Sequence, residues 1–376
     1  MSGLETLRSQ VPGADLAVRA PGRANLIGEH TDYNAGFVFP LAIDLETTLL
    51  ARRTDGVVRL RSGDAEGVIE VDLSTGRGPD DGWGRYVTAV VQQLLEAGLP
   101  VRGLDGALSS TVPSGAGLSS SAALEVAVAL AVLDSAALRE PMRPEDIAKL
   151  CQRAENIGVG VASGLMDQLA SACGVEGSAL LLDCRSVTFE AVPLPAGVAV
   201  VLVDSAVPHS LVDSEYGERR KSCEAAAASL DVEFLRDVDE RALTAAEDSL
   251  DPLVFRRARH VVTENDRVLL AAAALHRGDL VHLGALFAAS HASMSADFEI
   301  TTPEVDQLVE LAVATPGVHA SRMTGGGFGG CVVSLVDAER APEIAEQVRS
   351  TYAEASGLPA RAWVCTAAAG AQVLPL

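Results

Sequence analysis

PSGAGLSSSAA, residues 113–123, follows a predicted strand at 104–112 and opens a predicted long helix. Gly115 and Gly117 allow the backbone to turn sharply and to approach a ligand closely. The serine hydroxyls suit the N-cap of the helix. The free N–H groups of a first helical turn, together with the helix dipole, attract an anion. This order of elements predicts a phosphate-binding loop, although a capped helix after a plain glycine turn has the same composition.

The loop differs from two common nucleotide-binding patterns. No lysine follows the glycines, so the segment is not a Walker A motif, and its glycines lack the GxGxxG spacing of nicotinamide-binding domains. A serine hydroxyl, by contrast, is an oxygen ligand of the kind that Mg²⁺ prefers. The sequence thus disfavours a dehydrogenase and is compatible with a magnesium-dependent phosphate site.

A second glycine-rich segment, RMTGGGFGGC at 322–331, precedes a predicted buried strand at 330–336. It has five glycines within residues 325–330, and each of them costs chain entropy on folding. Close approach of this backbone to a ligand or to the first glycine loop would explain that cost. A tight turn is the plainer interpretation.

GRANLIGEHTDYN, residues 22–34, concentrates hydrogen-bonding side chains. A predicted strand at 15–20 is expected to end at Pro21 and Gly22, so the segment is predicted to be a loop in which these side chains converge. Carboxylates and an imidazole suit the hydroxyls of a sugar, which both donate and accept hydrogen bonds. Taken alone, a solvated polar turn would look the same. The side chains are Arg23, Glu29, His30, Asp32 and Asn34.

Two further acids lie in predicted helices. Asp167, in SGLMDQLA, falls in the first turn of a helix at 164–173, where the dipole favours its ionised form and a nearby arginine would favour it more strongly. Glu155 lies twelve residues earlier, at the unfavourable C-terminal end of a helix at 144–156. A metal ion would compensate this carboxylate, while fraying into solvent is the simpler interpretation.

The chain has 376 residues, a length typical of about two domains. Hairpins and helices do not alternate regularly, which favours an α+β fold over a regular βαβ chain. We place the boundary near Pro193 and Pro195. This gives an N-terminal α+β domain at 1–190 with the sugar motif and the phosphate loop, and a C-terminal α+β domain at 191–376 with the glycine-rich motif 325–330.

Hydrophobic patterning predicts further elements around these motifs. Two strands of one sheet are expected within 36–50, and a buried central strand at 197–204. The basic clusters at 219–221 and 256–259 are interpreted as solvated helix faces.

The formal net charge of −22 argues against nucleic acid and anionic membranes as partners. The N-terminus has no basic stretch followed by an apolar run, so no signal peptide is predicted. The most apolar helical stretch, 122–138, carries Glu125 and Asp134 and is too short and too charged for a membrane span. Six cysteines without a CxxC pair indicate reduced thiols. We therefore expect a cytoplasmic protein.

Taken together, the motifs resemble those of the galactokinases, within the superfamily of galactokinase, homoserine kinase, mevalonate kinase and phosphomevalonate kinase. The glycine loops at 113–129 and 322–331 are features of the superfamily, whereas GRANLIGEHTDYNAGFVFP at 22–40 is typical of galactokinases and their closest relatives. The resemblance extends over about residues 18–366. Further matching segments are GLMDQLAS at 164–171, SEYGERRKSCE at 214–224, RHVVTEN at 259–265 and ASHASMSADFEIT at 289–301.

This resemblance implies two α+β lobes with the active site in the cleft between them, and ATP-dependent phosphorylation of the anomeric C1 hydroxyl of galactose. Asp167 matches the position of the family's catalytic base, and Arg23 the position that stabilises this aspartate and the developing phosphate charge. Five further positions match those that line the family's sugar pocket: Glu29, His30, Asp32, Gly164 and Tyr216.

The family's ATP phosphate loop corresponds to Gly115, Ala116, Gly117, Leu118, Ser119, Ser120 and Ser121. Its magnesium ligands correspond to Ser121 and Glu155, with Ser120 as a rival for the metal. Two departures from the family pattern are small: Ala24 stands where valine is common and Ser163 where cysteine is common, and neither supplies chemistry.

Two other functions stay open at this point. A related kinase for N-acetylgalactosamine or arabinose would use the same chemistry in a different pocket. A sugar- and ATP-sensing regulator without catalysis can lose residues of the serine-rich loop, yet LSSSAAL, Glu155 and Asp167 are all present here. The expected partners are a small sugar, ATP and Mg²⁺, and the sequence does not distinguish a monomer from a weak oligomer.

Overall fold

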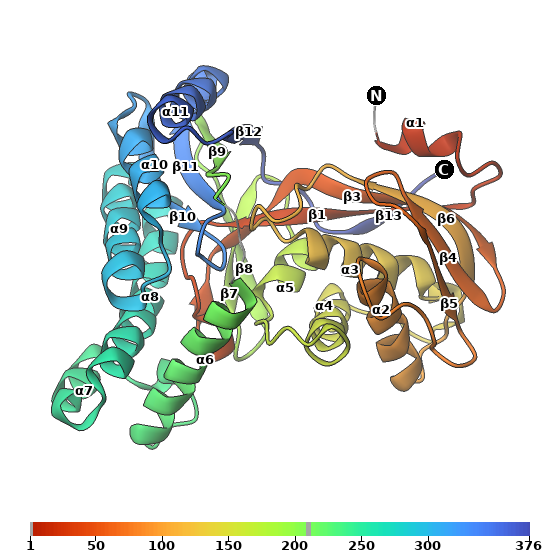
Figure 1. The fold of residues 1–376 in the computed structure, drawn as a ribbon, viewed down its shortest axis with the longest axis horizontal. Coiled ribbons are helices and arrows are strands. Elements are labelled where there is room, and N and C mark those ends of the chain that lie inside the picture. Colours follow the sequence, from red (N-terminus) through yellow and green to blue (C-terminus); the bar gives the residue numbers. More distant parts are fainter. Residues whose placement is uncertain (1–2, 208–211) are drawn as a thin grey trace.

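The longest strands of the protein build a six-stranded sheet (Figure 1). The computed structural model describes residues 3–207 and 212–376. The strands of this sheet are β1 Leu16–Asn25, β3 Pro40–Thr54, β4 Val57–Ser62, β5 Val68–Asp72, β6 Gly103–Ser110 and β13 Gln372–Leu374. They run in the order β13-β1-β3-β6-β4-β5, and neighbours are antiparallel except β4 and β6, which are parallel. The C-terminal strand β13 thus lies beside the first strand of the chain.

Helices cover one face of this sheet (Figure 1). They are α2 Gly84–Glu96, α3 Ser120–Val132, α4 Pro144–Arg153 and α5 Met166–Cys173. Val18, Leu49 and Val128 are fully buried in the core between them and the sheet. Because side chains alternate along a strand, Leu50 points to the other face, where it packs with Leu7 of the short helix α1 Gly3–Arg8. The layer of helices brings the phosphate loop before α3 close to the start of α5.

A four-stranded antiparallel sheet forms the centre of the other lobe. Its strands are β9 Val198–Asp204, β10 Val318–Thr324, β11 Cys331–Asp337 and β12 Arg361–Cys365. They run in the order β10-β11-β9-β12, so the predicted central strand at 197–204 is confirmed. The helices of this lobe are α6 Val212–Ser229, α7 Glu240–Ala245, α8 Pro252–His276, α9 Leu280–Ser293, α10 Pro303–Ala314 and α11 Ala341–Ser356. None of the helices in the described part of the chain has the length and apolarity needed to cross a membrane.

A small sheet and a shared core join the two lobes. The sheet consists of β2 Phe37–Val38, β7 Ser178–Asp183 and β8 Thr188–Pro193, in that order. Leu26 and Phe39 pack in one fully buried cluster with Phe287 and Val333 from the other lobe. The lobes therefore meet through continuous apolar packing, and the division of the chain at residue 190 stays a prediction.

Two π-helical turns extend α-helices of the protein. The first follows α4 and carries Glu155, and the second follows α9. The turns lie at Ala154–Val159 and Met294–Phe298, and short 3₁₀ helices lie at Asp32–Asn34, Ser135–Ala137, Leu235–Asp237, Glu247–Ser249 and Ala338–Arg340.

The prediction that Pro21 and Gly22 end the first strand is wrong. β1 continues to Asn25, because a β-bulge between Pro21 and Arg23 accommodates the proline. Gly22 is required at this place, since a Cβ atom there would lie 2.7 Å from the Leu118 carbonyl oxygen. Arg23 therefore lies on a strand rather than in a loop, and its backbone N–H donates to that same carbonyl at 3.1 Å.

Other expectations also differ from the structure. The two strands predicted within 36–50 belong to different sheets, because β2 pairs with β7 while β3 pairs with β1. The sequence patterns do not predict the β7–β8 hairpin or β10. The basic clusters are solvated only in part: Arg219 is 4% exposed and Arg257 is 7% exposed, whereas Lys221 is exposed. Arg219 Nε donates to the Phe298 carbonyl at 2.8 Å, so this cation holds two helices together.

Gly22→Ala is expected to lower the free energy of unfolding by about 1–3 kcal/mol, the usual cost of overpacking. The added methyl group would clash with the Leu118 carbonyl and with Val112. Urea unfolding followed by circular dichroism measures the change. Gly63→Ala is the control, because Gly63 is exposed and an added Cβ would meet only the Leu108 carbonyl, at 3.9 Å. Equal stability of the two variants would contradict the packing described for the bulge.

Candidate active site

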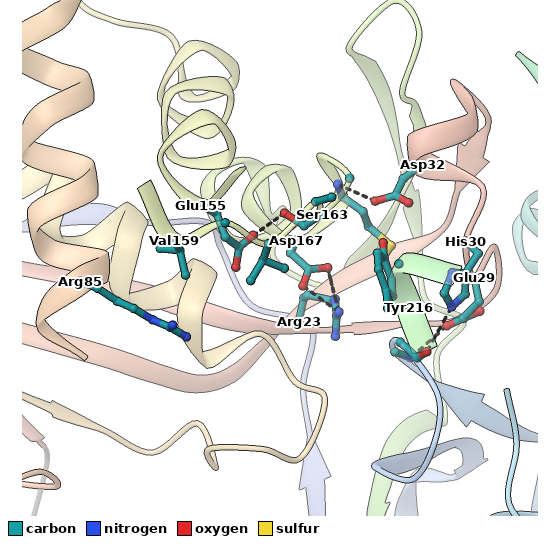
Figure 2. Close-up of a pocket in the computed structure, with 18 residues that line it drawn as sticks. Arg23, Glu29, His30, Asp32, Arg85, Glu155, Val159, Ser163, Asp167 and Tyr216 are labelled. Atoms are coloured by element: carbon teal, nitrogen blue, oxygen red, sulfur yellow. Dashed lines mark hydrogen bonds and ion pairs between the residues drawn. The ribbon is translucent and has the colours of Figure 1, made fainter. Parts of the chain in front are cut away.

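A cavity of about 400 Å³ opens between the lobes (Figure 2). Its walls come from both lobes, with the segment leading into α5 on one side and α6 and the glycine loop before β11 on the other. Residues predicted for catalysis, sugar binding and metal binding come together in this lining: Arg23, Glu29, His30, Asp32, Glu155, Gly164, Asp167 and Tyr216. The predicted phosphate loop at 115–121 does not line the cavity itself but is bonded to residues that do.

Arg23 and Asp167 form a two-point ion pair in the middle of the cavity (Figure 2). Arg23 Nε donates to Asp167 Oδ1 at 2.8 Å, and Nη2 donates to Oδ2 at 2.9 Å. The Arg23 side chain is 5% exposed, whereas that of Asp167 is 29% exposed. A planar guanidinium fixes a carboxylate in one orientation, so β1 sets the direction in which the acid of α5 faces the cavity.

The phosphate loop is attached to the same pair. Arg23 Nη1 donates to the Gly117 carbonyl at 2.6 Å, and Ser119 Oγ donates to Asp167 Oδ2. Gly115 and Gly117 have φ values of 74° and 72°, which only glycine adopts without strain. The loop therefore reaches the acid by a turn that its glycines make possible.

The expectation that the serines cap the following helix is wrong for Ser119. This residue is at the N-cap of α3, but its side chain makes no bond to the helix N–H groups and is directed to Asp167 instead. Because the N-cap side chain is engaged elsewhere, the N–H groups of the first turn of α3 are available for an anion.

Glu155 is buried in the π-helical turn after α4, so the expectation of a frayed, solvated acid is wrong. Its carboxylate accepts hydrogen bonds from Ser121 Oγ at 3.2 Å, from Ser163 Oγ at 2.5 Å and from Gln168 Nε2 at 2.9 Å. Burial raises the pKa of Glu155, and the charge of Asp167 raises it further. A carboxylate in this position would gain from a cation beside it.

Gly164 and Asp32 are in close contact at the end of the cavity opposite Glu155. A Cβ atom at residue 164 would lie 1.7 Å from Asp32 Oδ2, so only glycine fits. Asp32 Oδ1 accepts from the Tyr33 N–H at 2.9 Å. Burial raises the pKa of Asp32 to about 6, and the negative charge of Asp167 adds to the effect.

His30 forms part of the cavity wall with both ring nitrogens occupied. Its Nε2 lies 3.1 Å from the Gly326 carbonyl, which only accepts, so this nitrogen carries the proton and Nδ1 accepts from the Tyr33 hydroxyl at 2.8 Å. Burial lowers the pKa of His30 to about 3, so the ring is neutral. The rings of Tyr216 and Phe298 flank it, each with its centroid 4.8 Å away.

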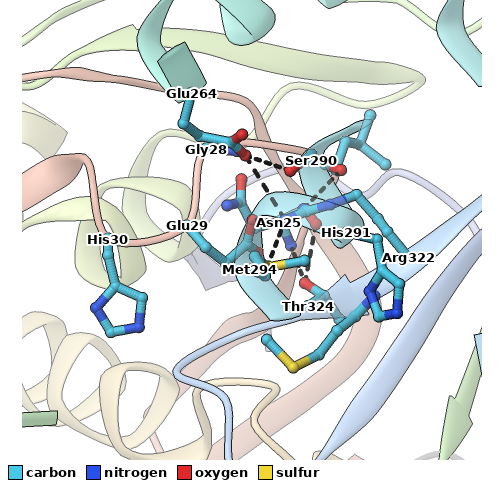
Figure 3. Close-up of polar contacts among 12 residues, drawn as sticks. Asn25, Gly28, Glu29, His30, Glu264, Ser290, His291, Met294, Arg322 and Thr324 are labelled. Atoms are coloured by element: carbon cyan, nitrogen blue, oxygen red, sulfur yellow. Dashed lines mark hydrogen bonds and ion pairs between the residues drawn. The ribbon is translucent and has the colours of Figure 1, made fainter. Parts of the chain in front are cut away.

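Glu29 lies at the edge of the cavity in a buried cluster of charges (Figure 3). Its carboxylate pairs with Arg322 and accepts from the Gly325 N–H at 3.2 Å. Arg322 is fully buried and also donates to the Leu26 carbonyl at 3.0 Å. Glu264 of α8 completes the cluster, with its Oε1 at 3.7 Å from Arg322 and bonded to the Gly28 N–H at 3.0 Å. Burial raises the pKa of Glu29, and Arg322 opposes this rise.

The second glycine loop packs against the first one, which is one of the two interpretations that the sequence allowed. A Cβ atom on Gly325 would lie 3.0 Å from the Gly117 carbonyl oxygen. A Cβ atom on Gly327 would lie 2.6 Å from the Ile300 carbonyl oxygen. The glycines therefore serve close approach between backbones at the cleft.

Several residues that shape the site were not singled out by the sequence. Arg322 stands three residues before Gly325, and nothing in the sequence around it marks a buried cation. Gln168 follows Asp167 and bridges Glu155 to Glu125, at 2.9 Å and 3.0 Å. No sequence signal pointed to Ser119 as a ligand of Asp167 rather than a helix cap.

Family models and solved structures match this chain. The galactokinase galactose-binding signature matches residues 7–53, and the N-terminal and C-terminal domains of the GHMP kinases match residues 85–175 and 271–354. The crystal structure of Lactococcus lactis galactokinase complexed with galactose is 36% identical, with a TM-score of 0.90 over 96% of this chain and 95% of that chain. The mevalonate kinase of Methanococcus jannaschii, at 18% identity, shares the fold, with a TM-score of 0.65 over 95% of this chain and 99% of that chain.

The decisive comparison is with a galactokinase of Chloroflexus aggregans, which is 46% identical over 361 residues. The aligned region covers 94% of this chain and 92% of that relative. Identity at this level over nearly the whole length of both proteins shows that the chain belongs to the galactokinase family.

Proposed function

We propose that this protein transfers the γ-phosphoryl group of ATP to the C1 hydroxyl of galactose, with Asp167 and Arg23 at the reacting centre. Membership of the galactokinase family makes it a kinase with ATP as co-substrate and galactose as acceptor. The observation that carries the assignment is the Arg23 guanidinium, which binds Asp167 and the Gly117 carbonyl together. The acid is thereby held between the sugar end of the cavity and the phosphate loop. A cytoplasmic location is part of the proposal, because ATP is supplied there.

Asp167 would orient the sugar hydroxyl and accept its proton. Arg23 and Ser119 donate three hydrogen bonds to this carboxylate, which hold its oxygens in one orientation. Proton transfer is expected late, when bond formation to phosphorus has made the hydroxyl more acidic. The aspartate contributes mainly by positioning, as is usual in phosphoryl transfer.

The loop at 115–121 would bind the triphosphate through the N–H groups at the start of α3. The donors near Glu155 suit Mg²⁺, because Ser121 Oγ and the Glu155 carboxylate lie 3.2 Å apart and are oxygen ligands. Ser121, rather than Ser120, is the serine bonded to Glu155, and we assign these two residues to the metal. When bound, Mg²⁺ would neutralise charge on the phosphate oxygens.

The other end of the cavity would hold galactose. Asp32, once ionised, would accept hydrogen bonds from sugar hydroxyls, and Gly164 leaves the room that this carboxylate needs. His30 has no free ring nitrogen, so we assign it, with Tyr216, to the wall that shapes the pocket. Glu29 would contact the sugar while Arg322 and the Gly325 N–H hold its carboxylate in place.

The proposed reaction is tested by ADP release from the purified protein with ATP, Mg²⁺ and a panel of sugars. Galactose should give the highest kcat/KM, well above N-acetylgalactosamine and arabinose. The product should no longer reduce alkaline copper, because phosphorylation at C1 blocks opening of the sugar ring. Higher kcat/KM with another sugar would overturn the substrate. Binding of galactose and ATP without ADP release would indicate a sensor rather than an enzyme.

Asp167→Asn is expected to lower kcat by ~10²–10⁴-fold, the range usual for loss of general acid–base help, while galactose affinity changes little. Asparagine keeps the shape of the side chain but cannot accept the proton. Steady-state kinetics and calorimetric titration with galactose give the two quantities. Asp80→Asn is the control, because Asp80 is exposed. Turnover close to wild type in Asp167→Asn would remove this residue from the chemistry.

Asp32→Asn is expected to stabilise the sugar-free protein at pH 8 and to weaken galactose binding there. The folded pKa of Asp32, about 6, lies above its ordinary value of 3.8. Wild-type stability therefore falls as the pH rises through this window, and stays lower above it. The cost at pH 8 is about 3 kcal/mol, and a neutral side chain avoids it.

Urea unfolding of Asp32→Asn and wild type at pH 8 and at pH 4.5 measures this effect. The variant's gain should be largest at pH 8 and fall to about a third of that at pH 4.5, where wild-type Asp32 is protonated in the folded state but still mostly ionised in the unfolded chain. The same difference between the two proteins at both pH values would show that Asp32 is not a buried titrating acid.

A further inference from the structure

Arg85 lines the same cavity, at the end away from the sugar residues (Figure 2). It is the second residue of α2, and its side chain extends from that helix past Val159 toward the centre of the cavity, with Asp167 and Arg23 beyond (Figure 2). A Cβ atom on Gly158 would lie 2.4 Å from Ala89 Cβ, so α2 packs tightly on the π-helical turn. This contact fixes the position of Arg85 relative to the turn that carries Glu155.

The contacts of Arg85 include the Tyr86 ring, whose centre lies 5.1 Å from the guanidinium carbon, but no anion among the described residues. Within residues 3–207 and 212–376, no carboxylate lies within ion-pair distance of it, and its buried Nε has no hydrogen-bond partner. Its one side-chain hydrogen bond in this part of the chain runs from Nη2 to the Tyr86 hydroxyl, at 3.3 Å. A cation in the first turn of a helix is also disfavoured by the helix dipole. The half-buried guanidinium therefore lacks the anion that would stabilise it.

The charges of the cavity lining indicate which anion this is. The lining carries two arginines, of which Arg23 is already paired with Asp167. The remaining charged side chains are acids: Glu29, Asp32, Glu155 and Asp167. A nucleoside triphosphate would enter this acidic cavity in a protein of net charge −22, so it needs an unpaired cation nearby. In the described part of the lining, Arg85 is the arginine without a carboxylate partner.

We propose that Arg85 binds the phosphate groups of the nucleotide, as a cation that acts beside the helix N–H groups of the phosphate loop. The proposal rests on the phosphoryl transfer proposed above. A guanidinium presents paired N–H donors that match phosphate oxygens, and Arg85 is separated from the sugar end by Asp167 (Figure 2). The sugar residues lie on the far side of that acid, so the ligand of Arg85 is the nucleotide and not galactose.

The test compares nucleotide binding by wild type, Arg85→Gln and Arg85→Lys. Calorimetric titration without galactose measures the affinities for ADP and for adenosine. Arg85→Gln should weaken ADP about tenfold or more, the effect of losing charge-assisted hydrogen bonds, and leave adenosine within about twofold. Arg85→Lys keeps the charge but not the paired donors, so its ADP affinity should fall in between. KM for ATP should rise in Arg85→Gln while KM for galactose stays unchanged.

Arg241→Gln is the matched control, because Arg241 is also the second residue of its helix, α7, but is exposed. It should bind ADP as wild type does. Unchanged ADP affinity in Arg85→Gln, or an equal loss for ADP and adenosine, would overturn the proposal. Arg85→Lys should bind galactose and unfold on heating as wild type does, which would show that the variant is correctly folded. Failure of wild type to phosphorylate galactose would instead count against the proposed function, since ADP binding is measured without the sugar.

Discussion

The Arg23 guanidinium is the interaction on which the geometry of the cleft depends. The Arg23 side chain projects from β1 directly after a bulge. It donates two hydrogen bonds to Asp167 and a third to the Gly117 carbonyl. A buried cation is costly unless its donors are satisfied, and here all three nitrogens have partners. A lysine offers one point of contact in place of the planar fork. Together with the bond from Ser119 to Asp167, the Arg23 side chain fixes the distance between the acid and the phosphate loop.

A second buried cation, Arg322, has a comparable role between the lobes. It comes from β10, pairs with Glu29 of the sugar segment and approaches Glu264 of α8. Removing one partner of such a buried pair typically costs ~3–5 kcal/mol, because the remaining charge is left uncompensated. Such a pair tolerates little displacement, so the sugar side of the cleft is kept in register with the opposite lobe. Specific recognition of a small polar ligand requires a pocket of this rigidity.

The content of the cavity could be predicted from the sequence because the reactive residues lie in short motifs of unusual composition. Asp167, Glu155 and the segment 22–34 supply all four carboxylates of the lining. The connections between them could not be predicted. Whether Ser119 caps its helix or binds an acid depends on where α5 lies, and that is a matter of tertiary packing rather than local propensity.

The same limit explains the errors in the fold. A proline normally ends a strand, and only the glycine and the bulge that follow Pro21 allow β1 to continue. Arg219 and Arg257 belong to a polar-looking helical pattern, yet both are buried because they bond to carbonyl and hydroxyl groups of a neighbouring element. Hydrophobic periodicity has no means of recognising a buried cation whose partners come from another part of the chain.

The C-terminal strand β13 has a consequence for how the protein is made. Residues Gln372–Leu374 pair with Ala17–Arg19 of β1, so the sheet that carries Arg23 acquires its outermost strand last. During synthesis, the N-terminal segments emerge from the ribosome before β13 has been made. Until then β1 is an unprotected sheet edge, open to pairing with other nascent chains. The catalytic lobe is therefore completed only after the strands of the other lobe have been synthesised, and its folding couples β1 to β13 rather than proceeding lobe by lobe.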